Sequence, residues 1–138
     1  MTRPPPVPRR LAAEALAALL LASLQLRTRP FERLVPARAR ATAPATHEQA
    51  RAIERVLRGW SRRLPWKPAC FEQALAARRL LETRGHEAVL HYGSRRGADG
   101  LEAHVWVSSG GTPVVGHRNA GDFVELARFP AAAATDAP

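Results

Sequence analysis

Cys70 and His104 are the two residues best suited by type and position to covalent chemistry. Cys70 is the only cysteine of the 138-residue chain and stands where the proline-containing segment 65–68 gives way to a run typical of a helix. His104 lies inside the strand-like run 103–107. Backbone amides at a helix start and a nearby cation both favour a thiolate over a thiol. We therefore expect a thiolate–imidazolium pair with a depressed thiol pKa, and a cysteine hydrolase.

Each of these residues also has a purely structural interpretation. Cys70 could be a small buried hydrophobic residue, and His104 a half-buried strand histidine bonded to backbone. We assign His47, His86 and His91 to structural or surface roles. His86 and His91 lack neighbouring carboxylates and the spacing of a zinc-binding helix, so we expect no metal.

A third catalytic residue would orient the imidazole of His104. Four residues downstream of it have suitable side chains: His117, Asn119, Asp122 and Glu125. We favour Asp122 for its charge and its place just before the apolar Phe123. The alternative is a solvated turn acid beside Gly121.

Composition narrows the choice of partner and compartment. The formal charge is +9, yet Lys67 is the only lysine among 21 basic residues and the arginines are scattered. Scattered arginines without a recognition motif do not indicate nucleic-acid binding, whereas an acidic peptide or protein would fit the charge. A single cysteine allows no intramolecular disulfide. We expect a cytoplasmic protein without a cofactor.

The pattern of elements predicts an α+β fold. Apolar spacing and helix signals predict helices over 11–26, 46–62 and 69–83, of which the second opens with the capping box Thr46 to Gln49. A Leu16, Leu19, Leu20 and Leu24 stripe marks the apolar face of the first helix. Alternating segments over 87–92, 103–107, 112–116 and 123–129 predict an antiparallel meander against which the Cys70 helix packs, with a polar loop over 93–100 and a hairpin turn at Gly110 and Gly111.

We divide the chain into four parts. These are a disordered arm at 1–10, a helix and linker at 11–45, the catalytic domain at 46–130, and a disordered tail at 131–138. The apolar stretch 11–26 is short for a membrane span, is interrupted by Glu14 and precedes no clear cleavage site, so we do not expect secretion.

Several motifs in fixed order resemble the transglutaminase-like cysteine proteases of lasso-peptide biosynthesis, the stand-alone leader peptidases of split maturation B proteins. The resemblance covers roughly residues 15–129. It rests on a Leu-rich opening helix and on Arg-Pro-Phe-Glu-Arg-Leu at 29–34, Pro-Ala-Cys-Phe-Glu-Gln-Ala-Leu-Ala-Ala-Arg-Arg-Leu-Leu at 68–81, Arg-Gly-His-Glu-Ala-Val-Leu-His-Tyr-Gly at 84–93, Ala-His-Val-Trp-Val at 103–107 and Val-Val-Gly at 114–116.

The resemblance implies a papain- or transglutaminase-like fold with Cys70 as nucleophile and His104 as its base. Members with a full triad commonly carry an Asp where this chain has Gly116. That departure leaves a Cys–His dyad, or Asp122 as a substitute for the missing carboxylate. Chemistry similar to that of papain would attack the scissile carbonyl, hold the oxyanion on backbone amides and release the acyl-enzyme with water.

The resemblance also implies three partners. These are a lasso precursor peptide, a leader-binding protein that presents the leader, and an asparagine-synthetase-like cyclase that closes the macrolactam. The 11–26 helix and the Arg-rich helix at 47–62 are candidate docking surfaces. Alternatives are a non-catalytic scaffold that holds precursor or cyclase, and an acyl transferase that uses an amine in place of water.

Overall fold

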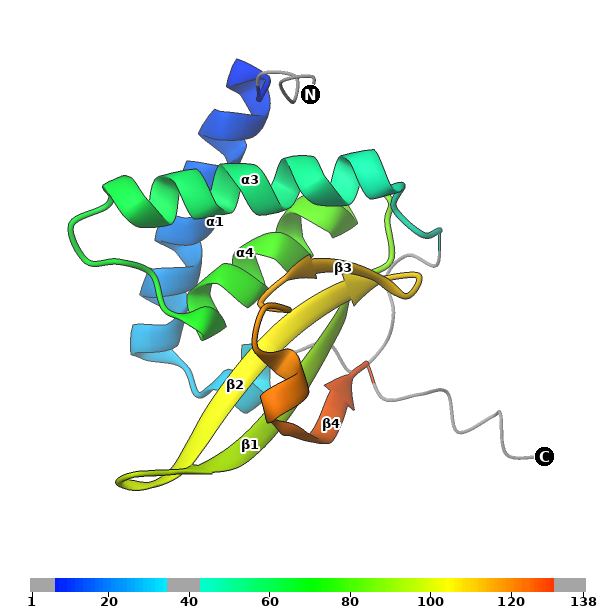
Figure 1. Ribbon diagram of the computed structural model, residues 1–138. Helices are drawn as coiled ribbons and strands as arrows, with labels where there is room; N and C mark the ends of the chain where they lie inside the picture. Colours follow the sequence, from blue (N-terminus) through cyan, green and yellow to red (C-terminus); the bar gives the residue numbers. More distant parts are fainter. Residues whose placement is uncertain (1–6, 35–42, 131–138) are drawn as a thin grey trace, which may run out of the picture.

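The computed structural model describes residues 7–34 and 43–130 and has helices packed on one face of a four-stranded sheet (Figure 1). The predictions made for residues 1–6, 35–42 and 131–138 lie outside this range. In chain order the elements are α1 (Arg9–Thr28), α2 (Phe31–Leu34), α3 (His47–Arg63), α4 (Cys70–Thr83), β1 (Val89–Gly97), β2 (Gly100–Ser109), β3 (Thr112–Val115), the 3-10 turn η1 (Ala120–Asp122) and β4 (Val124–Phe129). The predicted α+β class is confirmed.

The helices begin and end where their signals indicated. The capping box of α3 is present, with the Thr46 hydroxyl accepting from the Gln49 amide and the Gln49 side chain accepting from the Thr46 amide. Helix α4 is followed by Gly85 at a φ of 77°, a conformation that glycine adopts without steric cost. Part of the predicted linker forms the short helix α2.

Helix α1 buries a different face from the one expected. Its buried residues are Leu11, Ala15, Ala18, Leu19 and Ala22. Leu20 and Leu24 are exposed, because the small alanines allow α1 to approach its neighbours closely. The Trp60 indole of α3 donates to the Ala12 carbonyl at 2.8 Å and ties the two helices together. By length and composition alone α1 could cross a membrane, a test that core helices of soluble proteins also pass.

The sheet is antiparallel, in the order β3-β2-β1-β4, so the predicted meander is wrong at its last step. After β3 the chain crosses to the far edge and β4 pairs with β1. The β1–β2 hairpin is also longer than expected, because only Ala98 and Asp99 separate the Gly97–Gly100 pair. The predicted polar loop is therefore mostly strand, stabilised across the hairpin by an Arg95–Glu102 ion pair at 2.9 Å. The Gly110-Gly111 turn is confirmed, with both residues at positive φ.

A single apolar core joins the helices to one face of the sheet. Val105 and Val107 of β2 are buried in it with Leu75, Leu80 and Leu81 of α4. Because neighbouring strand residues face opposite ways, His104 and Trp106 point to the other face. The packing thus holds the first residue of α4 at a fixed place beside β2.

Candidate active site

Cys70 is the first residue of α4, as predicted. Ala69 is the N-cap and contributes no side-chain hydrogen bond, and the first helical bond runs from the Gln73 amide to the Ala69 carbonyl at 3.0 Å. The Gln73 side chain donates to the Pro68 carbonyl at 3.0 Å and so braces the preceding turn. No capping side chain therefore occupies the first-turn amides of α4, which remain able to bind an anion.

The thiol of Cys70 is half-buried beside β2. Burial raises its pKa above the ordinary value, although hydrogen bonding from the backbone amides of Val105, Phe71 and Cys70 itself acts to lower it. The expected depressed pKa is thus not what the resting protein has. Desolvation by burial is the largest of these effects and outweighs the helix-end amides.

This raised pKa gives a first prediction. Iodoacetamide should modify Cys70 in the free protein more slowly at pH 7 than it modifies a model thiol of ordinary pKa, and the rate should climb as the pH rises into the alkaline range. Intact mass against time at several pH values measures it. A rate at pH 7 above that of the model thiol would show a thiolate already formed in the resting protein.

His104 lies on β2 next to the residue that contacts Cys70. Its Nε2 lies 2.8 Å from the carbonyl oxygen of Gly116. A carbonyl only accepts, so Nε2 carries a proton and the lone pair available in the neutral tautomer is on Nδ1. Across the part of the chain that the structure describes, no hydrogen bond joins His104 to Cys70. The imidazole is nevertheless held in the tautomer that a base acting through Nδ1 requires.

Gly116 occupies the position where an aspartate was expected, and it contributes its main-chain carbonyl. Its φ is 79°, and a Cβ there would lie 2.9 Å from the Val105 carbonyl oxygen and 3.0 Å from Cβ of Trp106. Both the backbone conformation and the lack of space favour glycine. A carboxylate cannot be introduced at this position without moving the backbone that orients His104.

Gly116→Ala should consequently destabilise the protein by about 1–3 kcal/mol, the usual cost of strain at a positive φ. Urea unfolding followed by circular dichroism measures the change in the free energy of unfolding. Gly121→Ala is the control, because nothing lies within 4 Å of a Cβ built there. Equal stability of the two variants would contradict the close approach of Gly116 to β2.

Asp122 lies in η1 and its carboxylate faces Arg95. The two side chains are 3.6 Å apart, and that of Asp122 is 66% exposed. Arg95 also stacks on the ring of Phe123, 4.5 Å from its centroid, and Phe123 lies 5.0 Å from the His104 ring. Asp122 therefore helps to place the segment that covers His104, and within the described residues it makes no hydrogen bond to the imidazole.

Asp122→Ala should leave substrate cleavage within about threefold of wild type, because an exposed ion pair contributes little. Initial rates with a peptide that the wild-type protein cuts measure it, and Asp99→Ala in the hairpin turn is the matched control. A loss of a hundredfold or more, with the fold retained, would instead make Asp122 the third catalytic residue.

A second polar group lies on the same sheet face and was not predicted. His91 is bonded through Nδ1 to Glu125 and through Nε2 to the Ser108 hydroxyl at 2.7 Å. Burial alone would raise the pKa of Glu125, but hydrogen bonds from Arg128 and His91 lower it overall. Glu125 reaches His91 because β4 pairs with β1, a long-range contact that the sequence did not indicate.

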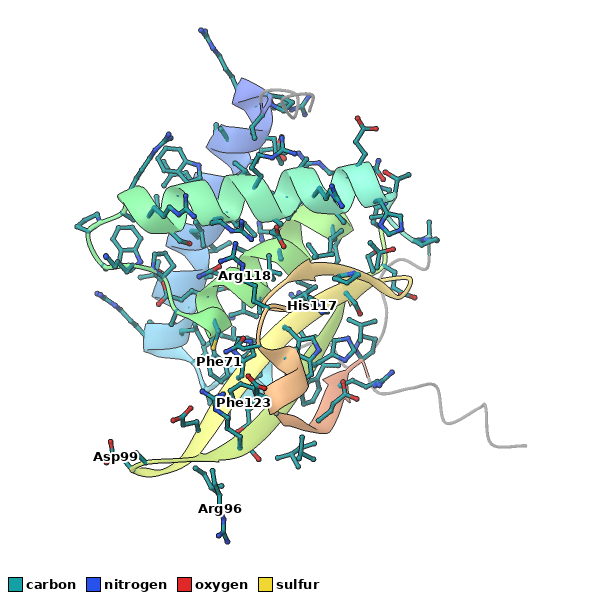
Figure 2. All side chains as sticks on the ribbon, viewed as in Figure 1. Phe71, Arg96, Asp99, His117, Arg118 and Phe123 are labelled. Carbon is teal, nitrogen blue, oxygen red and sulfur yellow. The ribbon has the colours of Figure 1, made fainter. Side chains whose placement is uncertain are left out.

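The Trp106 indole separates the two histidines. Its ring stacks on His91 at 5.6 Å and on His104 at 5.8 Å between centroids. His117 bonds through Nε2 to the Val107 carbonyl at 2.7 Å, and burial, together with nearby His91 and His104, lowers its pKa. Figure 2 shows His117 and Phe123 on the segment that crosses the sheet. These contacts fix the ring plane of His104.

The other candidate residues have structural surroundings. Asn119 precedes η1 and its carbonyl accepts from the Asp122 amide at 3.0 Å. Trp66, 39% exposed, donates to Glu72 at 3.2 Å and forms a wall near the start of α4. Among the described residues, no group of three or more His, Cys, Asp or Glu side chains could hold a metal ion.

Comparison with known proteins gives one match. The sequence model of a family described as Transglutaminase-like superfamily matches residues 12–128. No curated protein and no solved structure matches the chain. The matched range runs from α1 to β4 and includes Cys70 and His104, and this fold is commonly that of a cysteine peptidase. The chain belongs to the transglutaminase-like superfamily.

Proposed function

We propose that this protein is a cysteine peptidase that removes the leader from a lasso precursor peptide, with Cys70 as nucleophile and His104 as base. The observation that carries the proposal is the placement of Cys70 at an uncapped helix start, against the amide of the residue that follows His104. The Gly116 carbonyl supports it by holding the proton of His104 on Nε2.

In the proposed reaction, Nδ1 of His104 approaches the thiol and takes its proton as the sulfur attacks the scissile carbonyl. The first-turn amides of α4 stabilise the oxyanion. The imidazolium then protonates the departing amine, which is the N-terminus of the core peptide. Water, activated by the same Nδ1, hydrolyses the leader thioester and restores the thiol. The raised pKa of Cys70 favours this general-base route over a preformed ion pair.

The experiment is mass spectrometry of a precursor peptide incubated with this protein and a leader-binding partner, beside Cys70→Ala. A single Cys70-dependent cut at the leader–core junction supports the proposal. Leader and core masses that sum to the precursor plus one water indicate hydrolysis. A leader mass that carries an added amine indicates acyl transfer, and an uncut precursor contradicts both.

The second candidate function is a non-catalytic scaffold that binds precursor or cyclase. Two observations favour it, namely the raised pKa of Cys70 and the carbonyl that stands where a carboxylate would stabilise the imidazolium. Stoichiometric binding of the precursor without cleavage would establish this function.

Partners in the proposed pathway are a leader-binding protein and a macrolactam cyclase, in a cytoplasmic setting. The exposed Leu20 and Leu24 of α1 offer an apolar contact. Arg51 and Arg62, both exposed along α3, offer a basic one. Leu24→Asp should weaken co-purification with whichever partner binds α1. Unchanged co-purification of both partners would assign α1 no docking role.

A further inference from the structure

Strand β2 is paired along only part of one edge. On one side β1 pairs with it from Gly100 to Ser108. On the other side β3 pairs only with Val107, Ser108 and Ser109. Figure 1 shows the remaining half of β2 running past the end of α4 with β1 on one side and no strand on the other. Within the described part of the chain, the edge before Val107 therefore has no strand partner.

The backbone groups on this edge follow from the antiparallel ladder. Alternate residues of β2 direct their amide and carbonyl away from β1. The Val107 carbonyl does so because it accepts a hydrogen bond from His117 Nε2. The Val105 amide does so because it contacts the Cys70 thiol. By the same alternation, Ala103 and Leu101 direct their N–H and C=O groups to the open edge.

The open edge is short and accessible. It ends at the Val105 carbonyl, which Gly116 approaches closely. Ala103 and Leu101 are both exposed, and the Leu101 side chain is 79% exposed. Ala103 presents only a methyl group to an incoming chain, and Leu101 offers an apolar side chain on the same face as Val105. Arg96 and Asp99 extend from the hairpin end, away from the helices (Figure 2).

We propose that the edge formed by Leu101 and Ala103 binds the peptide substrate as an added β-strand and leads its scissile bond to Cys70. Unpaired strand edges bind extended peptides through main-chain hydrogen bonds, with alternate side chains in contact with the surface. Ala103 stands two residues, about 6.6 Å, from Val105. A strand paired with Ala103 therefore continues directly to the thiol that contacts Val105.

The occupant is the extended segment that flanks the cut, because this edge adjoins the proposed nucleophile and the outer edge of β4 does not. The inference rests on the proposed function for the role of Cys70. It adds the main-chain recognition that places a peptide there, and it identifies the class of substrate as an extended, unstructured peptide.

The first test is a scan of substrate backbone amides. Synthetic peptides spanning the leader–core junction, each with one N-methylated residue, are compared by kcat/KM. Strand addition predicts losses of about tenfold or more at alternate positions and little effect between them, because only alternate amides face β2. Losses without a two-residue period, in a peptide that wild type cuts, would overturn the edge while leaving the peptidase in place.

The second test changes the protein. Ala103→Pro removes one outward amide without removing a bond to β1, and it should raise KM by about tenfold, as expected for one lost hydrogen bond. Ala103→Val keeps the amide and is the matched comparison, and its KM should rise less than that of Ala103→Pro. Equal KM values for the two variants would contradict the proposal.

Hydrogen exchange separates this inference from the proposed function. In Cys70→Ala protein, the unmodified junction peptide should protect the amides of Leu101 and Ala103. Protection there without cleavage by wild type would support the edge and contradict the peptidase. Cleavage by wild type without such protection would support the peptidase and contradict the edge. Protection that grows with protein concentration alone would assign the edge to a second copy of the chain and overturn the proposal.

Discussion

Cys70→Ala should abolish cleavage of the precursor, lowering kcat by at least about 10³-fold, because no other group can form the acyl-enzyme. The fold should persist, since alanine is the strongest helix former and Cys70 is only the first, half-buried residue of α4. Product formation followed by mass spectrometry, beside the circular dichroism spectrum of the same sample, measures both effects.

Cys70→Ser is the matched control for that loss. It keeps the size and a hydroxyl but replaces the better nucleophile, so it should retain binding and lose most of the cleavage. Full activity in either variant would remove Cys70 from the mechanism. If Cys70→Ala loses both activity and helical signal, Cys70→Ser decides the question, because it perturbs the helix start least.

His104→Ala should lower kcat by about 10²–10⁴-fold, the range that general acid–base catalysis contributes. The reason is the fixed tautomer, because the Gly116 carbonyl leaves Nδ1 as the only basic atom of the ring. Rates across a pH series measure the loss, and added imidazole should restore part of the activity of the variant.

The control for His104 is His47→Ala, which removes an exposed imidazole at the start of α3. It should cut as wild type does. If His104→Ala keeps more than a tenth of the wild-type rate while His47→Ala is unaffected, the base must be another group. His117 would then be the first residue to replace, because its imidazole lies on the segment that crosses from β3 to β4 and contacts β2 at the Val107 carbonyl.

Local signals predicted the elements that position Cys70. The Thr46 capping box, the Pro65–Pro68 turn and Gly85 each act within a few residues, so their consequences could be derived from sequence. The alternation around His104 likewise predicted a strand, and the structure has β2 there. For these residues the local preference and the tertiary packing agree.

Long-range pairing could not be derived in the same way. Whether β4 pairs with β3 or β1 depends on the path of residues 116–123, and that path depends on Gly116, whose positive φ starts the crossing. The length of the hairpin likewise follows from a two-residue turn that composition did not indicate. These features decide which groups surround His104. The Gly116 carbonyl, which orients its ring, was therefore not predicted.

The pKa of Cys70 was mispredicted for a related reason. The helix-start position correctly indicated amides that favour a thiolate, but burial against β2 is a tertiary effect with the opposite sign and a larger size. Asp122 was favoured for its charge, and the contact of its carboxylate with Arg95 is likewise a tertiary feature that the sequence did not indicate.

The central claim is that Cys70 forms a covalent acyl-enzyme with the leader. Its most direct test is intact-mass spectrometry of the protein after brief incubation with precursor and leader-binding partner, followed by acid quench and peptide mapping. We expect a species heavier by the leader mass less one water, mapped to Cys70, labile to hydroxylamine and absent from Cys70→Ala. Cleaved precursor with no adduct, or an adduct on another residue, would contradict the account.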